Sequence, residues 1–240
     1  MKAPWYLDVR IRQLRPELID QPGLDVKTHR TALCAIAGIH SLAFTHRFYW
    51  KAIRPFAERP ASRPVRVLDV ACGSGDVAVK LAKTAQRAGW PIIVDGCDLS
   101  SIAVSLAQER AELAQVPSRF FSFDALNGVW PDDYDVIITS LFMHHLRNDE
   151  AVHVLRQMAN SARRMVLVND LIRSPFGYLL ARFGTPLLTR SPLVHYDAPT
   201  SVARAFTPIE LIGLAHRAGM LGATVSRCWM SRMQLQWSRT

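Results

Sequence analysis

The stretch VLDVACGSGDVAVKLA, residues 67–82, decides the fold of this chain. It begins as an apolar run and continues, after two closely spaced glycines, with apolar residues at helical spacing. Gly73 and Gly75 therefore stand where a strand turns into a helix. Glycine at such a turn adopts backbone angles that other residues avoid and places no Cβ in the way of a ligand. We expect Gly73 and Gly75 to form the floor of a ligand site.

The composition is that of an ordinary globular protein. The chain has 240 residues, of which 49% are hydrophobic and 20% charged, enough for one sizeable domain. No run approaches the roughly 18–20 apolar residues of a membrane span, and the start has no signal-peptide core. The four cysteines form no CxxC pair. We expect a cytoplasmic monomer or homodimer with no metal site and no transmembrane segment, for which peripheral membrane contact stays open.

Apolar runs alternate with helical patterns from residue 65 to about residue 170. The runs are VRVLDVA, PIIVDGCD, RFFSFDA, YDVIITS and RMVLVND. Strands that are apolar on both faces and alternate with helices predict a parallel sheet covered on both sides. Because the connections in such sheets are right-handed, the sheet is doubly wound. The final runs, ATVSRCWM and SRMQLQW, predict an antiparallel hairpin. The predicted fold is α/β, a doubly wound, mostly parallel seven-stranded sheet.

Composition changes divide the chain further. Residues 1–60 are predicted to be helical and to form a lid or substrate segment, with Leu33, Ile36, Ile39, Ala43 and Phe44 on one apolar helix face. RPASRP, residues 59–64, is typical of a linker. Residues 62–240 form the predicted catalytic domain, in which the apolar segment 171–205 is a lid insertion. FTPIELIGLAHRAG predicts a helix with Thr207 as N-cap, Pro208 in its first turn and Gly219 after its end.

Three acids accompany the glycine turn. Asp69 lies in the first predicted strand, Asp98 closes the second, and Asp124 follows the third. In open α/β sheets, ligands bind beyond the carboxyl ends of the strands. A carboxylate at the position of Asp98 can accept hydrogen bonds from both hydroxyls of a ribose. Asp124 is suitably placed for an amino group on a base.

With these residues the chain resembles the class I S-adenosylmethionine-dependent methyltransferases over roughly residues 62–225. Ala71 stands where the class I motif usually has its first glycine, but LDVACGSGD is especially similar to the version of the motif in the ubiquinone and menaquinone C-methyltransferases. A dinucleotide-binding dehydrogenase fits less well, because its G-x-G-x-x-G needs a third glycine. The resemblance implies a Rossmann-like methyltransferase fold and S-adenosylmethionine as cofactor, with S-adenosylhomocysteine as product. It implies a cofactor site made of Asp69, Ala71, Cys72, Gly73, Gly75, Asp98, Leu99, Asp124, Ala125, Ser140 and Leu141.

The candidate catalytic residues follow the fourth strand. SLFMHHLRNDE lacks the Asn/Asp-Pro-Pro-aromatic motif of enzymes that methylate bases or glutamine. Its histidines resemble the CHDWSDE-type segment of plant phenolic O-methyltransferases, which implies that His144 is a base and that His145 falls on a position that this family does not use for catalysis. The family's flanking acid falls on Asp170. Imidazole is the natural base near neutral pH. The alternative is that the rings cap a helix or pack beneath the cofactor.

The acceptor is expected to be a small, apolar aromatic molecule. RPELIDQPGLD near the start and HYDAPTSVARAFTPIEL near the end resemble methyltransferases encoded beside bacterial polyketide and aryl-polyene pathways, which implies a phenolic or quinone-like acceptor of secondary metabolism. Methylation of oxygen is favoured over carbon. The formal charge of +9 and the pI of about 9.9 motivate RNA methylation as a weaker alternative, although no dense basic block accompanies them. A non-catalytic subunit is a third possibility.

Overall fold

The computed structural model describes residues 8–21, 23–57 and 63–239, so most of the predicted linker 59–64 lies outside the described residues. Its centre is a seven-stranded sheet in the order β3-β2-β1-β4-β5-β7-β6. Five strands are parallel: β1 Val65–Val70, β2 Ile92–Asp98, β3 Phe120–Ser122, β4 Val136–Ser140 and β5 Met165–Leu171. The antiparallel hairpin, β6 Thr224–Cys228 and β7 Arg232–Ser238, joins through β7 to β5. The predicted fold class is confirmed.

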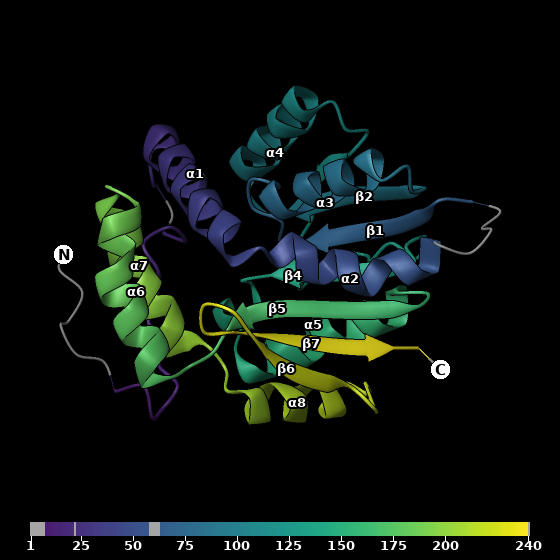
Figure 1. Cartoon of the computed structure of the whole chain (residues 1–240). Coiled ribbons are helices and arrows are strands. Elements are labelled where there is room, and N and C mark those ends of the chain that lie inside the picture. The colour runs from purple at the N-terminus through teal and green to yellow at the C-terminus, as the bar shows by residue number, and fades with distance from the viewer. Residues whose placement is uncertain (1–7, 22, 58–62, 240) are drawn as a thin grey trace.

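Helices cover both faces of the sheet (Figure 1). On one face, α2 Thr45–Ala57, α3 Asp76–Arg87 and α4 Ser101–Ala114 enclose an apolar cluster with β1 and β2. On the other, α5 Asn148–Ser161 and α8 Pro208–Arg217 pack with β4, β5 and β7 on a second cluster. The central strands are buried on both sides, which is why their sequences are almost continuously apolar.

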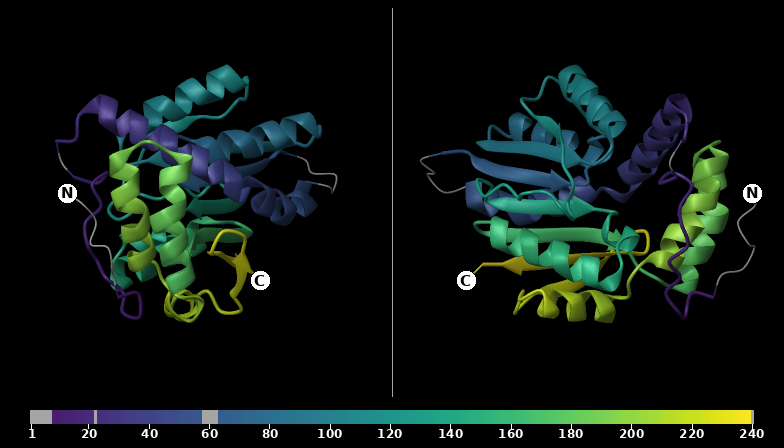
Figure 2. Two further views of the ribbon diagram at one scale, coloured as in Figure 1. Left: turned by 60° about the vertical axis from the view of Figure 1, so that its left-hand side comes forward. Right: turned by 180° about the vertical axis from the view of Figure 1, so that it is seen from behind.

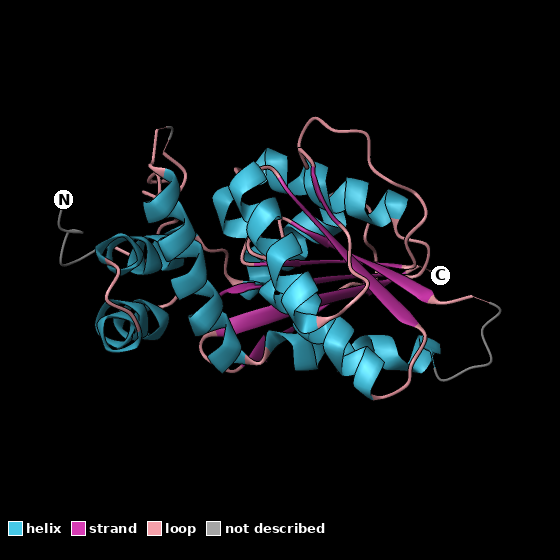
Figure 3. Cartoon of the chain, turned by 90° about the horizontal axis from the view of Figure 1, so that it is seen from above, coloured by secondary structure: helices cyan, strands magenta, loops and turns pink. Residues whose placement is uncertain are grey.

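A third group of helices lies beyond the carboxyl ends of the parallel strands (Figures 1, 2 and 3). It consists of α1 Val26–Ala43, α6 Pro175–Leu188 and α7 Pro192–Arg204. The N-terminal segment runs along α7, where the amide of Gln13 donates to the carbonyl of Ala203 at 3.0 Å. The division into lid and catalytic domain stays a prediction; α6, α7 and the α1 part of the predicted N-terminal lid lie at this edge, whereas α2 packs on a face of the sheet. The strand order reverses between β1 and β4, so a ligand site is expected there.

Local signals place two of the helix ends. The apolar face predicted to run through Phe44 is interrupted, because Phe44 is left-handed at φ 51° and separates α1 from α2. At α8, Thr207 accepts a hydrogen bond from the amide of Glu210, whose side chain accepts one from Thr207 in return. Pro208 opens that helix and Gly219 follows it at φ 89°, as predicted. Within the described ranges, no helix combines the length and the apolar character needed to cross a bilayer.

Candidate active site

The turn after β1 separates the roles of its two glycines. Gly73 has φ 53°, and a Cβ added to it would meet nothing within 4 Å. Gly75 has φ 69°, but its Cβ would lie 2.7 Å from the Cβ of Ala107 and 3.0 Å from the ring of Phe120. Gly73 therefore opens onto ligand space, whereas Gly75 permits close packing of the turn on α4 and β3. Gly75 is not among the residues that line the cavity, so its part in the floor of the site stays a prediction.

The space above Gly73 is a cavity of about 800 Å³. The loops after β1, β2, β3 and β4 form one side of it, and α1, α6 and α7 form the other. Most predicted cofactor residues line this cavity: Asp69, Ala71, Cys72, Gly73, Asp98, Leu99, Asp124, Ala125, Ser140 and Leu141. The exception is Gly75. The sheet topology thus brings residues from four separate loops to one place.

Asp98 and Asp124 are held by hydrogen bonds from backbone amides of the loops that follow the strands. Asp98 accepts from the amide of Gly73 at 2.8 Å and from that of Ser100 at 2.9 Å. Burial raises the pKa of Asp98, and these two amides oppose the shift. Asp124 accepts from the amides of Leu126 and Asn127, and the Asn127 side chain lowers its pKa. Both carboxylates are therefore oriented before any ligand arrives.

A second group of polar atoms lies deeper, beside the glycine turn. Asp69 is buried, and its Oδ1 has no hydrogen-bond partner among the residues that the structure describes. Burial raises the pKa of Asp69 well above its usual value, and the charges of Asp76 and Asp98 add to the shift. The Nδ1 atom of His40 lies 3.3 Å from Asp76, while its Nε2 lacks a partner in the same described set. A positively charged ligand would stabilise these carboxylates.

Arg232 supplies a buried cation on the same side of the cavity. This β7 residue donates to the side chains of Thr45 at 3.1 Å and Asn169 at 3.4 Å, both neutral oxygens. Burial lowers its pKa. Nothing in the sequence singled out Arg232, because a lone arginine in a terminal strand is indistinguishable from a surface residue. Pairing of β7 with β5 brings it to the cavity.

His144 and Asp170 form a buried pair. His144 belongs to the short 3-10 helix η1, Met143–His145, and Asp170 lies near the end of β5. The Nδ1 atom of His144 is 2.7 Å from Oδ1 of Asp170, and the His144 amide donates to Oδ2 at 3.1 Å. Burial raises the pKa of Asp170, but the charge and hydrogen bonds of His144 outweigh it and the net shift is downward. Nε2 of His144 is left to face the cavity side, 3.7 Å from Glu17.

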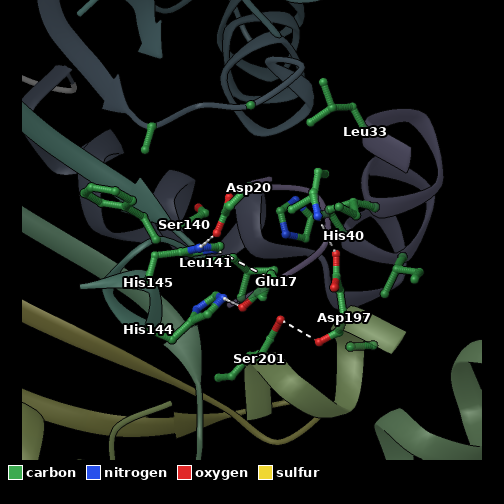
Figure 4. A pocket seen from close by; sticks show the side chains of 18 of the residues that line it. Glu17, Asp20, Leu33, His40, Ser140, Leu141, His144, His145, Asp197 and Ser201 are labelled. Atoms are coloured by element: carbon green, nitrogen blue, oxygen red, sulfur yellow. Dashed lines mark hydrogen bonds and ion pairs between the residues drawn. The ribbon is translucent and has the colours of Figure 1, made fainter. Parts of the chain in front are cut away.

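His145 stands beside His144, with the two ring centroids 4.3 Å apart. Its Nδ1 lies 2.9 Å from Oδ2 of Asp20, and its Nε2 lies 3.9 Å from Glu17 (Figure 4). Burial alone would lower the pKa of His145, but the carboxylates of Glu17 and Asp20 raise it to about 9. His145 is therefore a cation near neutral pH. This arrangement gives it the role of an ion-pair partner of the N-terminal segment.

Glu17 is a site residue that sequence reasoning missed. Its side chain is almost fully buried, and its Oε1 lies 3.7 Å from Nε of Arg204 without a hydrogen bond among the described residues. Asp197 on α7 fixes the backbone next to it by accepting from the amides of Leu18 at 2.7 Å and Ile19 at 3.0 Å. The two sequence features that resembled one family, RPELIDQPGLD and HYDAPTSVARAFTPIEL, thus lie in contact. Their joint presence was the signal that could have identified Glu17.

Two arginines fix the backbone of η1. Arg204 donates to the carbonyls of His144 at 3.2 Å and His145 at 2.8 Å. Arg12 donates to the carbonyls of His144 at 3.2 Å and Leu146 at 2.6 Å. The carbonyls at the end of this helix would otherwise lack donors, and charged donors are strong ones. The position of the histidine pair therefore depends on the N-terminal segment and on α7.

Glu17, His144 and His145 place three ligand atoms within 4.8 Å of one another. Two imidazoles and a carboxylate are a donor set that could hold a divalent cation. The sequence predicted no metal site. A metal at Nε2 of His144 would occupy the lone pair that proton transfer requires, so the two roles exclude each other.

Residues 67–164, from β1 to the residue before β5, match the family model for a methyltransferase domain. The match begins at the strand that carries the glycine turn and includes the His144–His145 pair. This region is a methyltransferase domain. This match and the sheet order described above agree with the resemblance to the class I S-adenosylmethionine-dependent methyltransferases.

Named relatives of the methyltransferase domain act on different molecules. The chain is 35% identical over 160 residues to the 2-phytyl-1,4-naphtoquinone methyltransferase of Synechococcus elongatus, covering 62% of this chain and 63% of that protein. It is 34% identical over 119 residues to the 27-O-demethylrifamycin SV methyltransferase of Amycolatopsis mediterranei, covering 47% and 41%. The chain thus spans less than two thirds of the length of these curated relatives.

A solved structure has the same fold as the methyltransferase domain and its flanking helices. Magnesium protoporphyrin IX methyltransferase from Synechocystis, with bound S-adenosylhomocysteine, superimposes with a TM-score of 0.59. The match covers 92% of this chain and 91% of that one at 16% sequence identity. The fold is therefore shared over almost the whole chain, while the residues have diverged.

Proposed function

We propose that this protein transfers a methyl group from S-adenosylmethionine to a hydroxyl of a small, apolar aromatic acceptor, with oxygen favoured over carbon. The observation that carries the proposal is the 2.7 Å contact between His144 Nδ1 and Asp170 Oδ1. The two residues lie beside the cavity, which is lined on one side by the loops after β1, β2, β3 and β4 and on the other by α1, α6 and α7. A buried imidazole held by a carboxylate is arranged to take a proton.

The residues on the cofactor side of the cavity support S-adenosylmethionine as the methyl donor. Asp98 would accept hydrogen bonds from the ribose hydroxyls, and Asp124 would accept one from the amino group of the adenine. The open backbone at Gly73 leaves room for the methionine chain. Oδ1 of Asp69, which has no hydrogen-bond partner among the described residues, is available to a positively charged group of the cofactor, and Arg232 would face the carboxylate of the cofactor. When bound, the cofactor supplies an electrophilic methyl group on a sulfonium.

His144 would act as the general base. Donation from Nδ1–H to Asp170 fixes the tautomer, so that the Nε2 lone pair accepts the acceptor's hydroxyl proton. The oxygen forms a bond to the methyl carbon while the carbon–sulfur bond breaks, and its electron pair remains on sulfur. A phenol with a pKa near 10 is mostly neutral at pH 7, so a positioned base assists this step. Asp170 stabilises the imidazolium that results.

The acceptor side of the cavity has apolar walls. Ile36 and Ile39 of α1, Leu180 and Leu188 of α6 and Val194 of α7 line it. Such a lining supports an apolar ring over a polar acceptor. The cavity also carries seven carboxylates, which disfavours a polyanionic RNA: Glu17, Asp20, Asp69, Asp76, Asp98, Asp124 and Asp197.

Methylation of a ring carbon is the second candidate, because one relative is named as a naphthoquinone methyltransferase. Deprotonation of a phenol activates both its oxygen and its ortho carbon, so the same base serves either product. The test is incubation with methyl-¹³C-labelled cofactor and panels of phenols, resorcinols, hydroxybenzoates and quinols. Mass spectrometry detects the added methyl, and its ¹³C chemical shift separates O-methyl from C-methyl. Failure of every panel to yield product would refute the proposed acceptor class.

Binding of the cofactor is tested separately by calorimetry with Asp98→Ala. Loss of a charged hydrogen-bond acceptor for two hydroxyls predicts a fall in affinity of about 10–100-fold. His144→Ala serves as the matched control and should bind the cofactor as the wild type does. Equal losses in both variants would place His144 in the cofactor site and contradict its role as base.

A further inference from the structure

The outer face of α6 carries an unusual row of large apolar side chains. Phe176, Leu179, Phe183 and Leu187 are 69%, 53%, 66% and 86% exposed, respectively. Their spacing of three, four and four residues places them on one face of the helix. Figure 2 shows α6 at the outside of the molecule, away from the sheet. Soluble proteins expose single hydrophobic residues often, but a continuous apolar row marks an interaction surface.

The inner face of the same helix lines the cavity. Leu180, Ala181, Gly184 and Leu188 are among the lining residues. The helix therefore has apolar side chains on both its inner and its outer face, and it alone forms the wall between the cavity and the outside at this place. An ordinary lid helix would present polar residues to water, so burial against the cavity does not account for the outer row.

The charge around α6 is of one sign. Residues 171–196 contain three arginines and no aspartate or glutamate. Arg173 is buried and paired with Glu210, which leaves Arg182 and Arg190 beside the apolar row. An anionic surface complements this combination. A two-fold contact with a second copy would instead bring these arginines toward each other.

We propose that α6 is an interfacial helix that docks the protein on an anionic lipid bilayer. Phe176, Leu179, Phe183 and Leu187 enter the boundary between head groups and acyl chains, while Arg182 and Arg190 contact the lipid phosphates. With 14 residues, α6 is too short to cross a bilayer and lies along its surface. If the proposed function holds, an apolar acceptor reaches the cavity directly from the lipid phase past this helix.

Co-sedimentation of the full chain with lipid vesicles tests the docking. The probes are vesicles of phosphatidylcholine alone and of phosphatidylcholine mixed with phosphatidylglycerol. We expect the wild type to bind the mixed vesicles, and Phe176→Ser/Phe183→Ser/Leu187→Ser to lose at least tenfold in partition coefficient. The matched control is Leu113→Ser/Val129→Ser, which removes two similarly exposed apolar side chains from other surfaces and should bind as the wild type does.

A charge variant keeps the test independent of helix stability. Arg182→Glu/Arg190→Glu should fold as the wild type does by circular dichroism and lose its preference for the anionic vesicles. Absence of wild-type binding to either vesicle would overturn the proposal, as would equal binding by the serine variant. The proposal would also be overturned if the wild type were a dimer, the serine variant were a monomer, and neither protein bound vesicles. Because no methyl donor takes part, failure of the methylation assays would leave this result unaffected.

Discussion

The two sides of the cavity are built from different kinds of contact. On the cofactor side, successive loops of one sheet hold each other through nearby backbone atoms, as where Gly73 donates to Asp98. On the acceptor side, side chains more than a hundred residues apart in sequence meet, as where Glu17 faces His144 and Asp197 holds the backbone of Leu18. The first side follows from a local motif and the strand order. The second depends on how three helices and an N-terminal segment pack over the sheet.

The largest expected effect separates the chemistry of the two sides. His144→Ala should lower kcat by about 10²–10⁴-fold, the usual contribution of a general base. Cofactor affinity should stay within twofold, because His144 is bound to Asp170 and not to the glycine turn. Steady-state kinetics and calorimetry measure the two quantities.

Asp170→Asn is the companion to that variant. An amide cannot stabilise the imidazolium, so kcat should fall and its pH dependence should change while the stability of the cofactor complex is kept. An unchanged pH profile would mean that Asp170 acts only as a structural partner of the η1 backbone.

The next prediction distinguishes the two glycines of the cofactor side by their effects on stability and on cofactor affinity. Gly75→Ala adds a methyl group 2.7 Å from Ala107 at a positive φ, which costs roughly 2–5 kcal/mol of unfolding free energy as overpacking and backbone strain combined. Gly73→Ala has only the backbone strain, about 1–2 kcal/mol, but its methyl group projects into the cofactor space. Chemical denaturation should therefore rank Gly75→Ala as less stable, and calorimetry should rank Gly73→Ala as the weaker binder among folded variants. A reversed ranking would contradict the assignment of Gly73 to the cavity.

The sequence predicts the cofactor side well, because its information is local. The strand-turn-helix pattern around Gly73, and acids at the ends of successive strands, predict the sheet and most of the residues that line this side of the cavity before any tertiary contact is known. The packing of Gly75 against Ala107 and Phe120 was not predictable, because a sequence does not show which way a missing side chain points. Glu17 and Arg204 were not predicted as site residues for another reason. In the sequence each resembles an ordinary surface residue, and only the packing of the N-terminal segment on α7 buries them.

The acceptor side should show its ion pairs in the pH dependence of stability. The folded pKa of His145 is about 9 against a usual 6.5. Because the folded pKa is raised, the stabilisation is fully present below pH 6.5 and is lost as the pH rises through 9. The contribution is at most about 3 kcal/mol, reduced by the partial exposure of the ring. The charged or titratable groups that face His145 are Glu17, Asp20, Asp98, His144 and Arg204.

His145→Gln isolates this effect from other groups that titrate in the same range. The difference in unfolding free energy between wild type and variant should shrink steadily from pH 7 to pH 10, measured by urea denaturation. A constant difference across that range would show that His145 is neutral in the folded protein and that Glu17 and Asp20 do not hold the N-terminal segment through it.

The smallest expected effect returns to the glycine turn, at Ala71, which stands where the usual class I motif has its first glycine. Ala71 has φ 54°, a left-handed conformation that costs a residue with a Cβ about 1–2 kcal/mol. Ala71→Gly removes that strain but adds about 0.5–1 kcal/mol of conformational entropy to the unfolded chain. The net gain in unfolding free energy is then about 1 kcal/mol or less, seen as a rise in Tm of up to about 4 °C. The control is Ala85→Gly, at a buried position inside α3, which should lower the Tm. Opposite shifts of the Tm would show that the stabilisation by glycine is specific to the turn. If Ala71→Gly lowered the Tm as much as Ala85→Gly does, Ala71 would adopt its left-handed conformation without strain, and the strain proposed for this turn would be refuted.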